Sequence, residues 1–118
     1  MTRKQFETFV LDAIKDLPEE FRSRLDNVEI VIEGEPTRED LKSVGLTEED
    51  LLLGLYHGTP LTQRTSDYGM ALPDRIVLFQ SDIEDCCDTR EQIAEEVRKT
   101  VIHEIAHFFG LEEDELPY

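Results

Sequence analysis

Apolar residues recur at intervals of three or four positions near both ends of the chain, which is the spacing of an amphipathic helix. In the first segment, residues 6–17, a capping-box sequence at 2–5 precedes the apolar positions and a proline follows them. In the second segment, residues 93–108, another capping box at 89–92 comes before and Gly110 comes after. The pattern therefore predicts one helix near each end of the chain.

The middle of the chain carries patterns that are typical of strands. Residues 28–33 place Val28, Ile30 and Ile32 at every second position, as a strand with one buried face does. Residues 76–79 are apolar throughout and predict a strand that is covered on both faces. The run 51–56 is also apolar. We interpret its second half as a strand leading into a turn, and a helix is the alternative.

Shorter segments are expected to connect these elements. The sequence predicts short helices within 19–25 and 37–44, the second of them closed by Gly45. It also predicts a break at residues 26–27, a turn at 47–50 and a long loop over 61–74. Residues 81–88 are polar apart from Ile83, and we expect them to form a linker to the last helix.

The composition predicts a folded chain. Leu, Ile, Val and Phe make up about 30% of the 118 residues, above the roughly 20% below which charged chains tend to be disordered. Because two halves of such a chain would each be too small to bury a core, we predict a single domain over residues 1–118.

The net charge limits the possible binding partners, and the N-terminal residues and the cysteines indicate the cellular compartment. Twelve Lys and Arg residues against 28 Asp and Glu residues give a net charge of −16, which disfavours nucleic acids and anionic membranes as partners. The first residues lack the apolar core of a secretion signal, and no apolar run is long enough to span a membrane. Cys86 and Cys87 are adjacent, so we expect two free thiols rather than a disulfide, with metal binding as the alternative. These features predict a cytoplasmic protein.

Candidate chemistry lies in the last predicted helix. His103 and His107 are four positions apart, so on an α-helix they are separated by about 40° around the axis, and both imidazoles can reach one point. Apolar residues at 93, 97, 101, 105 and 108 are expected to face the core, so the histidines lie beside this apolar face and can face a cleft. The pattern His-Glu-x-x-His binds Zn²⁺ in hydrolases. It predicts that Glu104 is the general base that takes a proton from water during attack on an amide.

A catalytic zinc site needs a third protein ligand and one open position. Eleven residues follow His107, so this ligand must come from the short tail or from a segment upstream of the motif. Gly110 can adopt the left-handed conformation that ends a helix and turns the chain back. Glu113 and Asp114 are then both within reach of the histidines.

The motif His103-Glu104-x-x-His107-x-x-Gly110-x-x-Glu113 resembles the extended zincin motif, and the chain is most similar to the small bacterial zincin-like metallopeptidase family. Residues 53–64 and 72–76 resemble the middle segments of that family. The resemblance implies an α+β fold, a minimal zincin-like domain in which a small mixed β-sheet packs on an N-terminal helix and a C-terminal motif helix. It also implies that His103, His107 and Glu113 bind Zn²⁺, that Glu104 is the catalytic base, and that the substrate is a peptide or protein.

Two alternatives to this interpretation stay open. The small size of the chain, and a Glu at position 113 where Asp is more common in the family, also fit a non-catalytic metal-binding or protein-interaction module. The strand at 76–79 is either a central core strand, which its apolar residues favour, or a strand that pairs with an extended substrate. His57 and Tyr56 are interpreted as an exposed turn residue and a core residue rather than as catalytic groups.

Overall fold

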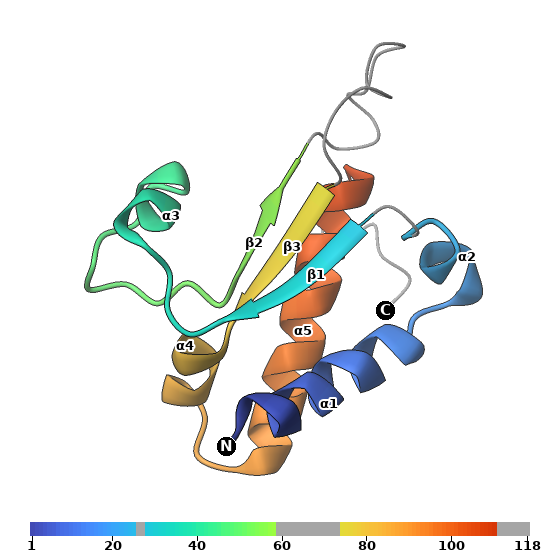
Figure 1. Ribbon diagram of the computed structural model, residues 1–118, viewed down its shortest axis with the longest axis horizontal. Coiled ribbons are helices and arrows are strands. Elements are labelled where there is room, and N and C mark those ends of the chain that lie inside the picture. The colour runs from blue at the N-terminus through green and yellow to red at the C-terminus, as the bar shows by residue number, and fades with distance from the viewer. Residues whose placement is uncertain (26–27, 59–73, 111–118) are drawn as a thin grey trace.

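The computed structural model describes residues 1–25, 28–58 and 74–110 (Figure 1). Within these residues, helices and strands follow one another without regular alternation, as in a small α+β domain. The elements are α1 (Arg3–Lys15), α2 (Glu19–Arg22), β1 (Val28–Glu33), α3 (Arg38–Ser43), β2 (Gly54–His57), β3 (Asp74–Phe79), α4 (Gln80–Asp85) and α5 (Arg90–Phe109).

The three strands form one mixed sheet in the order β1-β3-β2. The central strand β3 pairs in parallel with β1 and antiparallel with β2. Residues 76–79 of β3 are almost completely buried, because the sheet covers both edges of the strand and other elements cover both faces. The prediction of a central core strand is therefore confirmed. The suggestion that a substrate pairs with residues 76–79 is wrong, because neighbouring strands already take the hydrogen-bonding groups on both sides.

Helices α1 and α5 pack on one face of this sheet and on each other (Figure 1). The main core between these layers contains residues of α1, β3 and α5, among them Phe6, Val10, Ile76, Leu78, Val97 and Val101. On the other face, Leu55, Val77 and Phe79 form a smaller apolar cluster with Leu52. A small mixed sheet packed on an N-terminal and a C-terminal helix is the predicted α+β arrangement, which is thereby confirmed.

The helix boundaries follow the signals in the sequence. Thr2 and Thr89 accept hydrogen bonds from the backbone N–H groups of Gln5 and Gln92 and complete the two predicted capping boxes. Thr37 caps α3 in the same way. Gly110 follows α5 with a φ of 72°, the left-handed conformation that ends a helix with little strain only in glycine. The long motif helix therefore begins and ends where its sequence predicts.

The predicted linker at 81–88 is wrong, because residues 80–85 form helix α4. Ile83 is fully buried in the main core, and the helix also buries the polar residues Gln80 and Asp82. Hydrogen bonds compensate this burial: Arg3 Nε donates to Gln80, and the backbone N–H of Leu52 donates to Asp82. A prediction based on apolar spacing therefore missed α4, because the inward face of this helix includes buried polar side chains.

The other connections agree with the sequence where the structure describes them. Hydrogen bonds between Thr47 and Asp50 form the predicted turn. Asp74, which the sequence assigned to the loop over 61–74, is instead the first residue of β3. The remainder of that predicted loop and the break at 26–27 lie outside the described residues. In the described part of the chain, no helix combines the length and the apolar character needed to cross a membrane.

Candidate metal centre

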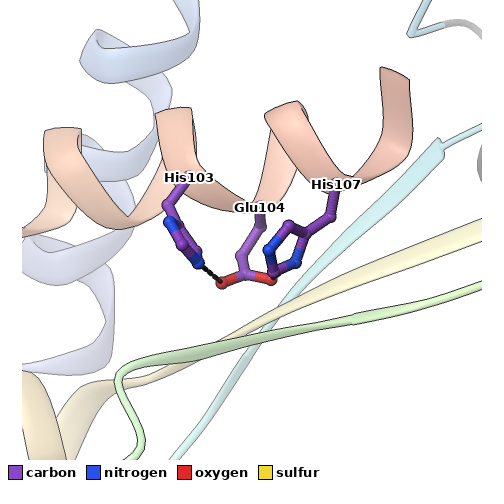
Figure 2. A group of neighbouring side chains, drawn as sticks. All are labelled: His103, Glu104 and His107. Carbon is purple, nitrogen blue, oxygen red and sulfur yellow. Dashed lines mark ion pairs between the residues drawn. The ribbon is translucent and has the colours of Figure 1, made fainter. Parts of the chain in front are cut away.

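Helix α5 brings His103, Glu104 and His107 together on one side (Figure 2). The two imidazole rings are 4.4 Å apart between centroids, and one ligand atom from each of the three residues lies within 4.8 Å of the others. Among the described residues, this is the only group of three or more His, Cys, Asp or Glu side chains placed so that they can share an ion. The convergence predicted from the four-residue spacing is present.

The packing of α5 determines which of these side chains meet solvent. Val97, Val101, Ile105 and Phe108 are buried in the core, as their spacing predicts. The neighbouring side chains of His103 and His107 are 40% and 48% exposed, so an ion can reach both rings from solution. Glu104 points toward the sheet and is only 4% exposed.

The Glu104 carboxylate lies between the two rings (Figure 2). Its Oε1 is 3.2 Å from Nδ1 of His107, and its Oε2 is 3.9 Å from Nε2 of His103. Glu104 therefore contacts both histidines from the buried side of the site, while the rings remain accessible from the solvent side. This arrangement can hold a carboxylate close to any molecule that binds beside the imidazoles.

Gly54 of β2 allows the strand to approach α5 closely at this point. A Cβ atom at position 54 would lie 2.6 Å from Cγ2 of Thr100 and 3.2 Å from Cγ of Glu104. Both contacts are shorter than normal packing permits, so only glycine fits without movement of its neighbours. This role was not predicted from the sequence, although a single glycine inside a short strand is a known sign of close backbone approach.

The histidines and Glu104 line one side of an open cavity of about 530 Å³. Its volume is in the range of small-molecule and peptide side-chain sites. The rest of its lining comes from β2, from the preceding half of α5 and from the segment between α3 and β2. The predicted cleft beside the histidine pair is therefore present.

The residues fit a divalent metal. Neutral imidazoles are preferred ligands of zinc and of related transition metals. A carboxylate can also bind zinc and these metals. The possible ligand atoms lie within 4.8 Å of one another, which is compatible with both rings binding one ion. Glu113 and Asp114, the two candidates for a third ligand, lie outside the described residues.

The other residues considered from the sequence do not join this group. His57 is exposed at the end of β2. Tyr56 packs edge-on against Phe108, and its hydroxyl donates a hydrogen bond to the buried carboxylate of Asp74 at 3.0 Å. Cys86 and Cys87 are free thiols in a separate part of the molecule, after α4. The structure thus gives Tyr56 a packing role, as its place in an apolar run predicts.

Comparison with known proteins supports the same fold and motif. Residues 25–118 match the family described as zincin-like metallopeptidase, whereas no curated protein matches the chain significantly. A solved structure of a conserved hypothetical protein from Thermus thermophilus is similar over 92% of this chain and 94% of its own, with a TM-score of 0.62 and 23% sequence identity. Such an identity supports the shared fold alone. Since the family match includes the whole sheet and the motif helix, this chain belongs to the zincin-like metallopeptidase family.

Proposed function

We propose that this protein is a zinc-dependent peptidase that hydrolyses peptide bonds in the cavity beside α5. The observation that carries the proposal is the placement of two accessible imidazoles and a buried carboxylate at the wall of one cavity. The family supports a metal at this position. The two free thiols of Cys86 and Cys87 fit the prediction that the protein acts in the cytoplasm, where thiols are kept reduced.

Each residue of the group has a separate role in this proposal. His103 and His107 would hold the zinc, with Glu113 as the proposed third ligand and Asp114 as its rival. Zinc at such a site polarises a substrate carbonyl and lowers the pKa of water to about 7. Glu104, which already lies between the rings, would accept the proton of the attacking water and pass it to the leaving amine.

The edge of β2 offers a place for the substrate backbone. Within the described sheet, β2 pairs only with β3, and its other edge borders the cavity that contains the histidines. An extended peptide can add to such an edge through main-chain hydrogen bonds. β2 therefore replaces the strand at 76–79 as the proposed site of peptide pairing.

Metal analysis of purified protein tests the ligand assignment. We expect about one zinc per chain in the wild type, and strongly reduced zinc content in His103→Ala and His107→Ala, because each change removes a direct ligand. His57→Ala is the matched control, since this exposed histidine is outside the group, and it should keep its zinc. Comparison of Glu113→Ala with Asp114→Ala identifies the third ligand. Equal zinc content in all five variants would contradict the site.

Cleavage of a mixed peptide library tests the catalytic role of Glu104. Glu104→Gln keeps the shape of the side chain but cannot take up the proton, so turnover should fall by about 10²- to 10⁴-fold while zinc content is unchanged. Undiminished turnover in this variant would reject the mechanism. Bound zinc without cleavage by the wild type would instead favour the non-catalytic metal-binding or interaction module.

A further inference from the structure

The cavity beside the histidines has an apolar wall opposite the metal-binding group. The segment that connects α3 to β2 contributes Val44, Leu46, Leu52 and Leu53 to this wall. Val44 is 44% exposed, one of few large apolar side chains that the described residues leave so open to solvent. An exposed apolar surface beside a few polar groups in one cavity is a feature of ligand-binding sites.

One end of this wall is fixed by the end of α3. Gly45 has a φ of 76°, and its N–H donates to the carbonyl of Lys42, while the N–H of Leu46 donates to the carbonyl of Leu41 at 2.8 Å. These two bonds form a Schellman motif, in which the residue after the glycine packs back against the helix. The position of Leu46 is therefore determined by local hydrogen bonds before any ligand binds.

The other end of the wall is fixed by α4 and β3. The N–H of Leu52 donates to Oδ2 of Asp82 at 2.9 Å, and Asp82 is itself buried. The carbonyl of Leu53 accepts a hydrogen bond from the N–H of Phe79 at 3.0 Å. With both ends held in place, the wall is preorganised, which reduces the entropy lost when a ligand binds.

The facing wall is polar and comes from α5. Lys99, His103 and His107 follow one another at four-residue intervals, so they line one side of the helix along the cavity. A peptide between the two walls would place one carbonyl at the histidines and a neighbouring side chain against Val44 and Leu46. The cavity therefore joins the reactive group to an apolar subsite.

We propose that the substrates carry a large aliphatic or aromatic side chain on a residue that flanks the bond to be cleaved, and that Val44 and Leu46 select it. This inference rests on the proposed peptidase function. It adds a class of substrate, which neither the family nor the metal group specifies. Removal of an apolar side chain from water on binding supplies the preference.

Peptide binding to zinc-loaded Glu104→Gln protein tests the subsite without turnover. The probes are two fluorescently labelled alanine-based peptides that differ at one central residue, Leu in one and Ser in the other, and binding is followed by anisotropy. We expect the Leu peptide to bind on the order of tenfold more tightly. A second substitution, Val44→Asn, should reduce this preference to less than about threefold.

Leu51→Asn is the matched control for Val44→Asn. Leu51 belongs to the same connecting segment and is 48% exposed, but it does not line the cavity. Leu51→Asn should leave the preference unchanged. Leu46→Ala provides a second change within the wall, one that introduces no polar group. Thermal unfolding of each variant shows whether it remains folded.

Equal binding of the two peptides, absence of binding by both, or an unchanged preference in Val44→Asn and Leu46→Ala would overturn the inference. Failure of the peptidase proposal gives a different result. In that case the wild type cleaves neither peptide, yet it still binds the Leu peptide more tightly. Cleavage of both peptides at equal rates would support the peptidase and reject the apolar subsite.

Discussion

At the scale of single residues, Cys86 and Cys87 are chemically different although they are adjacent. Their sulfur atoms are 3.9 Å apart, and Cys86 is exposed whereas Cys87 is partly buried. Partial burial, contact with the Cys86 thiol and the negative charges of Glu96 and Asp88 raise the pKa of Cys87 to about 11. Because the thiolate is the reactive form, Cys87 should be a poor nucleophile at neutral pH.

Alkylation with iodoacetamide tests this difference. At pH 8 we expect Cys86 to react first, and the rate at Cys87 should rise by about tenfold per pH unit until the pH approaches 11, since the thiolate fraction rises in that proportion. Peptide mapping by mass spectrometry assigns each modification. In urea-unfolded protein the two rates should converge. A faster reaction at Cys87 than at Cys86 in the folded protein at pH 8 would contradict the assignment.

The convergence of the candidate metal ligands was also predictable at the residue scale. His103 and His107 converge because an α-helix places residues four positions apart on the same side, and this geometry needs no other part of the chain. The burial of Glu104 was not predictable in the same way, because β2 covers it. The roles of His103, His107 and Glu113 as ligands stay predictions that the metal analysis tests.

At the scale of elements, the packing of β2 on α5 determines the shape of the candidate site. Gly54→Ala would push a methyl group to 2.6 Å from Cγ2 of Thr100. We expect a loss of about 1–3 kcal/mol in the free energy of unfolding, because overpacking forces neighbouring atoms to shift. Peptide cleavage should fall as well, since Glu104 must move. Urea unfolding and the library assay measure the two effects.

Two further variants make the test of Gly54 specific. Gly34→Ala is a control, because a Cβ atom there meets nothing within 4 Å, and it should change stability little. Thr100→Ser removes Cγ2 but keeps the hydroxyl that donates to the carbonyl of Glu96. Combined with Gly54→Ala, it should restore more than half of the lost stability. No recovery in the double variant would show that the clash with Thr100 is not the cause.

The elements also show where sequence patterns are reliable. The ends of α1 and α5 were predictable because capping boxes and a terminal glycine act through bonds within a few residues. Helix α4 was not, since its inward face includes Gln80 and Asp82, whose partners Arg3 and Leu52 are distant in sequence. Only the folded chain makes those polar residues compatible with burial.

At the scale of the whole molecule, a net charge of −16 on 118 residues makes the folded state repel itself. We expect the melting temperature of the metal-free protein to rise by several degrees when NaCl is raised from low millimolar to a few hundred millimolar, because salt screens this repulsion. The same salt weakens surface ion pairs such as Arg38–Glu48. Each of these contributes at most about 1 kcal/mol, so the screening of repulsion should dominate.

Calorimetry in the presence of a chelator measures this effect without a contribution from bound metal. KCl should act like NaCl, because the effect depends on ionic strength and not on a specific cation. Sucrose at matched osmolality is the uncharged comparison. A melting temperature that falls or stays constant as salt is added would show that repulsion between the acidic side chains does not limit stability.

The sequence by itself determined those features whose physics is local: helices α1 and α5 with their caps, the alternating strand β1, and the two histidines that share one side of α5. Tertiary structure alone decided that β1 and β2 are the partners of β3, how closely β2 approaches Glu104, and that apolar residues between α3 and β2 line the same cavity as the histidines. These features join segments that are far apart along the chain. Their contacts depend on how all the layers pack at once, so no short stretch of sequence specifies them.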